Sequence, residues 1–308
     1  IMTDNYQFKI GLYLGELGLP FVESLDVACD LGASYVWCGT HSNNRTLAEL
    51  PDDEIDAAAD QVAARSLEFF LLDGGGLFKT VHLAELESGK MMEHSQFKEQ
   101  FDKLERSMEV SVRLGIPAVG CSSFAWPAEY TAGKPTWPMR WATRGGIISD
   151  GDMEKLIEAF SMLADLAEKY DVDIAFLMMM WNYGNTSRNF RRIMEAVNSR
   201  RLKALWCPAD AYNCGEIDNA TTGFENLRPY LHGVHCKDLR TIDGSKLEFE
   251  YCPIAKGHVD YPTILRNLSE NECDVVLSIA THFLPESGSR LEAMQTNFAN
   301  IRGLIGKK

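Results

Sequence analysis

Short apolar segments recur along the chain, and most of them are continuous rather than alternating with polar residues. Eight such segments predict strands, at residues 8–14, 34–38, 68–73, 117–121, 172–180, 202–207, 233–236 and 274–280. A continuous apolar run of this length is typical of a parallel strand that is covered on both faces. The pattern therefore predicts a parallel sheet with helices on its outside.

Helical periodicity fills most of the gaps between the predicted strands. Apolar residues step by three or four positions at 157–167, at 291–304 and at Phe97, Phe101, Leu104, Met108 and Val112. Asp260, followed by Pro262, predicts a helix start. Strands that alternate with helices indicate an α/β fold. Because no G-x-G-x-x-G motif and no P-loop occur, we predict a single (β/α)8 TIM barrel domain over residues 1–308 rather than an open doubly wound sheet.

Two long connections interrupt this rhythm, at residues 124–149 after the fourth predicted strand and at 239–258 after the seventh. In a barrel both would lie at the C-terminal mouth, where active sites are built. The first connection carries Trp126, Trp137 and Trp141. These rings would stack on a sugar or anchor a lid or subunit interface, and the sequence leaves both roles open.

Composition narrows the classes of partner. The 308 residues include 45% hydrophobic and 24% charged residues, which is typical of a globular protein. The net charge of −14 argues against nucleic acid as a partner. No apolar run approaches the ~20 residues that cross a bilayer, and the first ten residues lack the features of a secretory signal. Eight cysteines without a C-x-x-C pair predict reduced, mostly buried thiols in a cytoplasmic protein.

Polar residues gather near the end of the seventh predicted strand. Alternation places His235 and Lys237 on the same side of that strand, with Asp238 at its exit. This pair predicts a functional site at the mouth. The simpler alternative is that Lys237 and Asp238 form an ion pair at the strand end.

Four short motifs follow one another between residues 205 and 283, and together they carry a family resemblance. They are Trp206-Cys207-Pro208-Ala209-Asp210-Ala211-Tyr212, His235-Cys236-Lys237-Asp238, Ala255-Lys256-Gly257-His258-Val259-Asp260-Tyr261 and Leu277-Ser278-Ile279-Ala280-Thr281-His282. In this order they resemble the xylose isomerase-like barrels, which include sugar isomerases, ketose 3-epimerases and inosose dehydratases. The first half of the chain agrees with that family only in its rhythm of strands and helices.

The resemblance implies one divalent metal ion held by a Glu of strand five, an Asp of strand six, a His of strand seven and a Glu of strand eight. In the family the two glutamates also serve as acid and base. Here residues 177–180 are apolar, and Cys207 and Ala280 replace two further carboxylates, so that only His235 remains. A hard ion such as Mg²⁺ prefers oxygen ligands. We therefore predict no metal and no other cofactor. The alternative is one divalent transition metal, Zn or Mn, with Cys207, Asp210 and His235 as the zinc ligands.

The predicted catalytic residues are His235 as the leading acid/base, with Lys237 and Asp210 in support. Lys237 and Arg140 are also placed to hold a carboxylate or phosphate group of a substrate. The predicted substrate-binding residues are Trp181, Asn182, Tyr212, His258, His282, Lys256, Arg140 and Trp137.

The resulting functional hypothesis is a sugar, cyclitol or sugar-conjugate isomerase, epimerase or lyase that moves a proton next to a carbonyl without the family's metal. The alternative is a catalytically silent relative that binds a sugar or serves as a structural subunit of an active homologue, in a homo- or hetero-oligomer. The run Met178–Met180 bears on this choice, because methionines that fill the mouth would leave a substrate no room.

Overall fold

The computed structural model describes residues 6–39, 41, 45–126, 147–244 and 248–306. Two predicted substrate-binding residues, Trp137 and Arg140, lie outside these ranges, as does Trp141. Within the described residues, no helix combines the length and the apolar character needed to cross a membrane. Six of the eight cysteines are buried, as predicted, and Cys29 and Cys273 are partly exposed.

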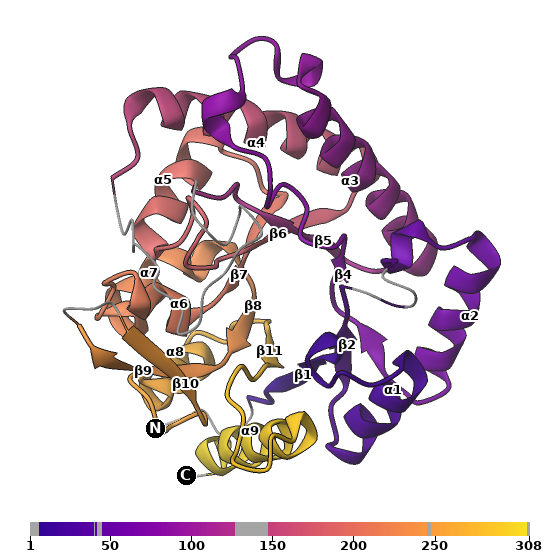
Figure 1. Ribbon diagram of the computed structural model, residues 1–308, viewed down its shortest axis with the longest axis vertical. Coiled ribbons are helices and arrows are strands. Elements are labelled where there is room, and N and C mark those ends of the chain that lie inside the picture. The colour runs from indigo at the N-terminus through magenta and orange to yellow at the C-terminus, as the bar shows by residue number, and fades with distance from the viewer. Residues whose placement is uncertain (1–5, 40, 42–44, 127–146, 245–247, 307–308) are drawn as a thin grey trace.

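The central feature is a parallel sheet that curls around on itself (Figure 1). Its order is β3-β2-β1-β11-β8-β7-β6-β5-β4. The strands are β1 (Lys9–Tyr13), β2 (Tyr35–Trp37), β3 (Glu68–Phe69), β4 (Leu72–Asp73), β5 (Ala118–Ser122), β6 (Asp173–Leu177), β7 (Leu202–Trp206), β8 (Leu231–Cys236) and β11 (Val276–Ile279). β3 and β4 stand at opposite ends of this order but only two residues apart in the chain, so they are two parts of one barrel strand. The eight predicted strands and the nearly closed barrel are thereby confirmed.

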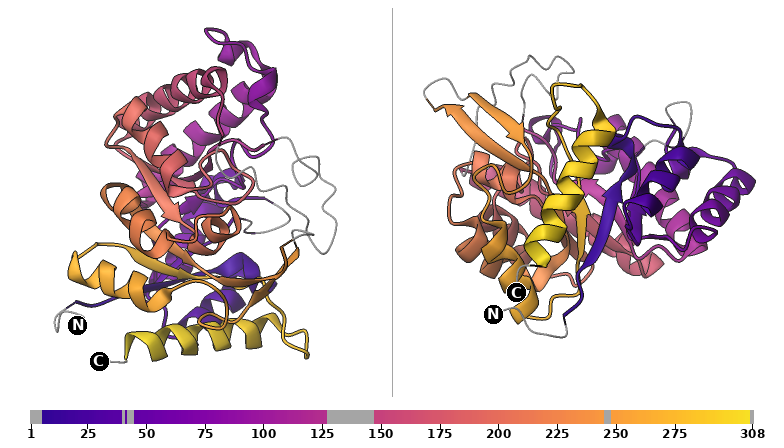
Figure 2. Two further views of the ribbon diagram at one scale, coloured as in Figure 1. Left: turned by 90° about the vertical axis from the view of Figure 1, so that its left-hand side faces the viewer. Right: turned by 90° about the horizontal axis from the view of Figure 1, so that it is seen from below.

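Helices surround the sheet on its outer face (Figures 1 and 2). They are α1 (Phe21–Asp30), α2 (Asp52–Ala63), α3 (Ser95–Leu114), α4 (Asp150–Tyr170), α5 (Ser187–Val197), α6 (Pro208–Asn213), α7 (Phe224–Leu227), α8 (Tyr261–Glu270) and α9 (Arg290–Ile305). Side-chain caps begin several of them. The Asp260 carboxylate accepts the Thr263 N–H at 3.1 Å, which confirms the predicted start of α8.

One helical prediction was wrong in detail. Phe97, Leu104 and Met108 are buried on α3, but Val112 is 55% exposed. The buried face continues through Val110 and Ser111 instead. A helix has 3.6 residues per turn, so repeated steps of four rotate away from the core face, and Val112 has left it.

The apolar core has two layers, as the continuous strand runs predict. The larger layer lies between the sheet and the helices. The smaller one comprises Trp37, Phe70, Leu71, Ala118, Ala175, Leu177, Met179, Leu205 and Val276. Leu177 and Met179 belong to this smaller layer, whereas Met178 and Met180 pack into the larger one. Of the methionine run, Met179 therefore faces the barrel interior.

The long connection after the seventh barrel strand forms an antiparallel hairpin, β9 (Asp238–Asp243) and β10 (Glu248–Cys252). It extends away from the barrel (Figure 2). The connection after the fourth strand falls largely outside the described residues.

Candidate functional site

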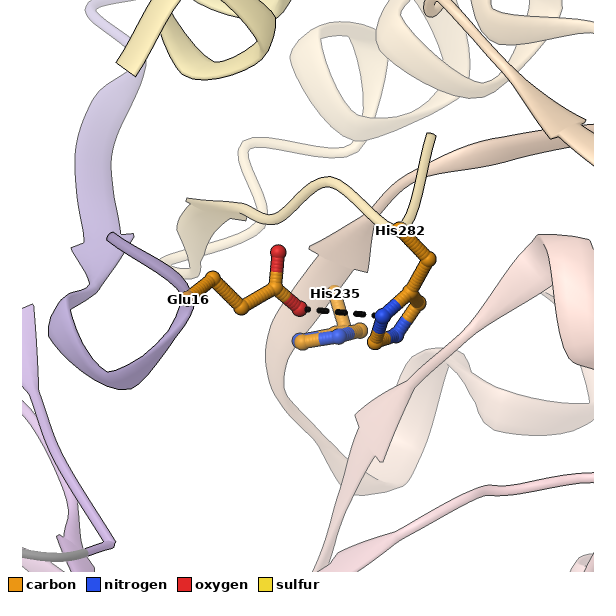
Figure 3. A group of neighbouring side chains, drawn as sticks. All are labelled: Glu16, His235 and His282. Atoms are coloured by element: carbon orange, nitrogen blue, oxygen red, sulfur yellow. Dashed lines mark ion pairs between the residues drawn. The ribbon is translucent and has the colours of Figure 1, made fainter. Parts of the chain in front are cut away.

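Three polar side chains converge at the carboxyl-terminal ends of neighbouring strands (Figure 3). Glu16 ends the short helical turn η1 (Leu14–Glu16) that follows β1, His235 lies on β8, and His282 follows β11. The three strands are adjacent in the order β1-β11-β8, so the ends of all three meet at one edge of the barrel. One potential ligand atom from each residue lies within 4.8 Å of the other two.

Glu16 is only 6% exposed, and neighbouring groups hold its carboxyl in place. Its Oε1 lies 3.4 Å from His282 Nδ1, and its Oε2 accepts the backbone N–H of Thr281. Burial raises the pKa of the Glu16 carboxyl to about 7, against the opposing effects of the Thr281 hydrogen bond and of the Lys237 and Arg290 charges. This carboxyl therefore changes its charge close to neutral pH.

The two histidines are neutral at pH 7. His235 is 2% exposed, its Nδ1 has no hydrogen-bond partner among the described residues, and the Trp37 ring meets it edge-on at 5.8 Å. Burial and the Lys237 charge hold the His235 pKa well below its ordinary value. The His282 side chain is 39% exposed and lies 4.8 Å from the Tyr251 ring. Loss of hydration and the Lys237 charge likewise hold the His282 pKa well below normal.

Lys237 forms a buried ion pair with Asp210. Its Nζ lies 3.1 Å from Asp210 Oδ1, and the two side chains are 2% and 0% exposed. The ammonium also lies 5.3 Å from the centre of the Tyr251 ring. Desolvation lowers the Lys237 pKa, but the Asp210 carboxylate and other nearby groups raise it by more, so the net pKa lies well above its ordinary value and Lys237 stays charged.

The alternative pairing of Lys237 with Asp238 does not occur. The Asp238 carboxylate instead accepts four backbone N–H groups, from Leu239, Ala255, Gly257 and Val259. Successive residues of a strand point to opposite sides. Lys237 consequently faces Asp210, and Asp238 faces the connection that follows the hairpin.

The remaining predicted residues divide into several groups. His282 joins His235 in the cluster. Tyr212 packs against the exposed His258 ring at 5.1 Å, and Lys256 is exposed nearby in sequence. Asn182 is fully buried, and its Nδ2 donates to the Leu177 carbonyl at 2.6 Å. The partly buried Trp181 ring lies 5.4 Å from Lys79 Nζ.

Glu16 is the site residue that sequence reasoning missed. It stands in Leu14-Gly15-Glu16-Leu17-Gly18, a segment in which no site residue was predicted. The available signal was an acidic residue between two leucines directly after a predicted strand. In a barrel that position lies at the mouth.

The four-ligand metal site that the resemblance implies does not fit these residues. Met179 is the inward-facing side chain beyond β6, and Cys207 and Ala280 are fully buried beside the mouth. None offers a carboxylate, and burial raises the pKa of the Cys207 thiol well above its ordinary value. Asp210, the other member of the alternative zinc site, is paired with Lys237. Among the described residues, the set that converges is Glu16, His235 and His282.

Comparison with known proteins shows which family has this fold. Residues 25–297 match the family model described as xylose isomerase-like TIM barrel. No curated protein matches the chain. A xylose isomerase domain protein from Planctomyces limnophilus has 17% identity, covers 99% of each chain and has a TM-score of 0.69.

Two epimerases have a similar structure. The 3-keto-D-glucoside 4-epimerase of E. coli has 16% identity over 96% of this chain and 100% of its own, with a TM-score of 0.70. The D-psicose 3-epimerase of Clostridium cellulolyticum H10, solved with D-tagatose, has 14% identity over 97% and 98%, with a TM-score of 0.67. These likenesses concern the fold. The family match covers most of the chain, and the chain therefore belongs to the xylose isomerase-like TIM barrel family.

Proposed function

We propose that this protein acts on a keto sugar, a keto cyclitol or a sugar conjugate by moving a proton at the carbon next to the carbonyl. The observation that carries the proposal is the convergence of Glu16, His235 and His282 at the barrel mouth, with the charged Lys237 close by. A carboxylate, imidazoles and a fixed cation are the groups that such chemistry requires.

Side chains of this protein both remove the proton and return it. A basic group of the cluster, on His235 or Glu16, takes the proton from the carbon next to the carbonyl. The electron pair of the broken C–H bond forms a C=C bond, and the carbonyl oxygen becomes an oxyanion. Return of the proton to the other face gives epimerisation, return to the neighbouring carbon gives isomerisation, and loss of a hydroxyl group gives elimination.

The ion pair of Lys237 with Asp210 has a supporting role in this proposal. Both side chains are too buried to exchange protons readily with solvent. A fixed ammonium close to the cluster stabilises negative charge that develops on the substrate oxygen, because a preorganised charge needs no reorientation during the reaction. Asp210 keeps that ammonium in place.

The substrate class is supported by the relatives. Structural neighbours include D-psicose 3-epimerases, solved with D-fructose or D-tagatose, and a 3-keto-D-glucoside 4-epimerase. All of these are named for reactions on hydroxylated carbonyl compounds. Because one scaffold serves several chemistries, this kinship supports the substrate class and does not select a substrate.

Deuterium exchange tests the proposal without knowledge of the product. The full chain is incubated in D₂O with D-fructose, D-psicose, D-tagatose, an inosose and a methyl 3-keto-glucoside, and the loss of the proton signal next to the carbonyl is followed by NMR. We expect enzyme-dependent exchange with at least one compound. His235→Asn and Glu16→Gln are each expected to slow it by about 100-fold or more.

The exposed Glu23→Gln on α1 serves as the control and should exchange at the unaltered rate. An unchanged rate in His235→Asn would remove His235 from the mechanism. Absence of exchange with every compound would contradict the proposed activity.

Two observations favour the second candidate, a catalytically silent sugar-binding or structural subunit. Met179 fills part of the barrel interior, and the carboxylates at the family's ligand positions are missing. Line broadening of a sugar's NMR signals on addition of the protein, without deuterium exchange, would identify this function instead.

A further inference from the structure

We propose that Glu16, His235 and His282 bind one divalent transition metal ion of the zinc class and leave part of its coordination sphere open. Two of these ligands, Glu16 and His282, lie outside the positions that the family resemblance implies. The inference adds a cofactor to the site of the proposed function: with the ion bound, His235 is a ligand, and the Glu16 carboxylate, which has a second oxygen, is the group left to take the proton. Metal binding itself does not depend on that function.

The first support is the spacing of the donor atoms. Zinc binds nitrogen and oxygen ligands at about 2.0–2.1 Å, so neighbouring ligand atoms of a tetrahedral ion are about 3.4 Å apart. Glu16 Oε1 and His282 Nδ1 are separated by 3.4 Å. A ring nitrogen of His235 completes a set in which no pair exceeds 4.8 Å. Small side-chain rotations would bring all three atoms onto one ion.

The second support is that the cluster contains unsatisfied polar atoms. Glu16 Oε1 and His235 Nδ1 are buried, and neither has a hydrogen-bond partner among the described residues. Buried polar atoms in a folded protein normally have a partner, and a bound ion is one accepted explanation for an exception. A cation between these side chains would give the Glu16 oxygen that partner directly.

Surrounding groups hold the three side chains in position. Thr281, which is adjacent to His282, donates its N–H to Glu16 Oε2, so one backbone segment positions two of the proposed ligands. The Trp37 ring borders His235, and its Nε1–H is fixed by Ser278 Oγ at 2.7 Å. Such outer contacts orient metal ligands and are a regular part of metal sites.

The donor set selects the class of ion. Two imidazoles and one carboxylate suit Zn²⁺, Co²⁺ or Fe²⁺, whereas Mg²⁺ and Ca²⁺ require mostly oxygen ligands. Three protein ligands with an open position are typical of catalytic rather than structural zinc. The negative charge of Asp210 is already balanced by Lys237, so the Glu16 carboxylate is free to balance the ion.

Cobalt binding gives the sharpest test, because Co²⁺ replaces zinc and is coloured. The untagged full chain is stripped with a chelator and titrated with Co²⁺, then with Zn²⁺ as a competitor, in the absence of any sugar. We expect one Co²⁺ per chain, visible d–d bands that Zn²⁺ abolishes, and no displacement by Mg²⁺. The spectrum should lack a thiolate-to-cobalt charge-transfer band, and the presence of that band would assign the ion to a site with a cysteine ligand, such as the alternative site at Cys207, and overturn the proposal.

Matched variants locate the ion. Glu16→Gln, His235→Asn and His282→Asn should each weaken Co²⁺ binding by at least about 100-fold, whereas His258→Asn, which removes an exposed imidazole outside the cluster, should not. Bound Zn²⁺ should also raise the melting temperature of the unaltered chain, which needs no variant to fold.

Absence of stoichiometric Co²⁺ and Zn²⁺ binding by the unaltered chain would overturn the proposal and leave Glu16 beside a neutral His282 without an ion between them. That result would not affect the exchange assay of the proposed function. Conversely, a metal site without deuterium exchange would overturn only the proposed function.

Discussion

Replacement of Asp210 by Asn is expected to lower the free energy of unfolding by about 3–5 kcal/mol, because it leaves the Lys237 ammonium buried without its counter-charge. The two side chains are 0% and 2% exposed, and their closest atoms are 3.1 Å apart. Water cannot hydrate the ammonium without opening the structure. The Tyr251 ring, 5.3 Å away, compensates only a small part of the lost attraction.

Urea denaturation followed by circular dichroism measures this effect. The double variant Asp210→Asn/Lys237→Met removes both charges and should recover most of the loss, since replacing a whole buried pair is often close to neutral. The exposed pair of Lys98 and Asp102 on α3 provides the matched control. Asp102→Asn should change stability by no more than about 0.5 kcal/mol. A loss below about 1 kcal/mol in Asp210→Asn would mean that the two groups are not a buried ion pair.

Replacement of Asp238 by Ala is expected to cost about 3 kcal/mol of stability and to loosen the connection after the hairpin. Asp238 Oδ1 accepts the N–H groups of Leu239 and Val259 at 2.9 and 3.2 Å, and Oδ2 accepts those of Ala255 and Gly257, both at 3.0 Å. Removal of the acceptor leaves buried donors unsatisfied, at about 1–3 kcal/mol for each that water cannot reach.

Hydrogen exchange separates this local effect from general unfolding. The amides of residues 255, 257 and 259 should lose protection in Asp238→Ala, while those of β4 and β5, which lie four and three strands from β8 in the sheet order, should retain it. Asn at this position keeps one acceptor oxygen and should show an intermediate loss. Unchanged protection at 255–259 would contradict the role assigned to this carboxylate.

The lack of space beside the Asp238 carboxylate provides a second test of its role. A Cβ on Gly257 would lie 2.3 Å from Asp238 Oδ1 and 2.4 Å from the Leu239 carbonyl oxygen. Gly257→Ala therefore should displace the same connection while leaving Asp238 unaltered. If Asp238→Ala and Gly257→Ala expose the same amides, then the close contact between Gly257 and Asp238 holds the segment, and not the Asp238 charge alone.

The fold follows largely from the sequence, because its signals are local. Continuous apolar runs mark strands that are buried on both faces, and six of the eight predicted strands contribute residues to both core layers. Asp260 with Pro262 marks a helix start through a contact only three residues long. The family resemblance rests on motifs between residues 205 and 283, within the range that the family model matches.

Only part of the candidate site was predicted from the sequence. Alternation along one strand correctly joins His235 and Lys237 on one side of β8. The partner of Lys237 required the tertiary structure, because Asp210 and Asp238 are chemically equivalent candidates and only the folded chain shows which of them faces the ammonium.

The sequence by itself therefore determines the strands, the helices, the barrel and the presence of His235 at its mouth. The tertiary structure alone decides that Glu16 and His282, which are 266 positions apart in the sequence, meet at that histidine. The physical reason is barrel closure, which seats β1 beside β11 and β11 beside β8 through backbone hydrogen bonds. These pairings are non-local. The residues around Glu16 in the sequence do not indicate which side chains barrel closure places beside it.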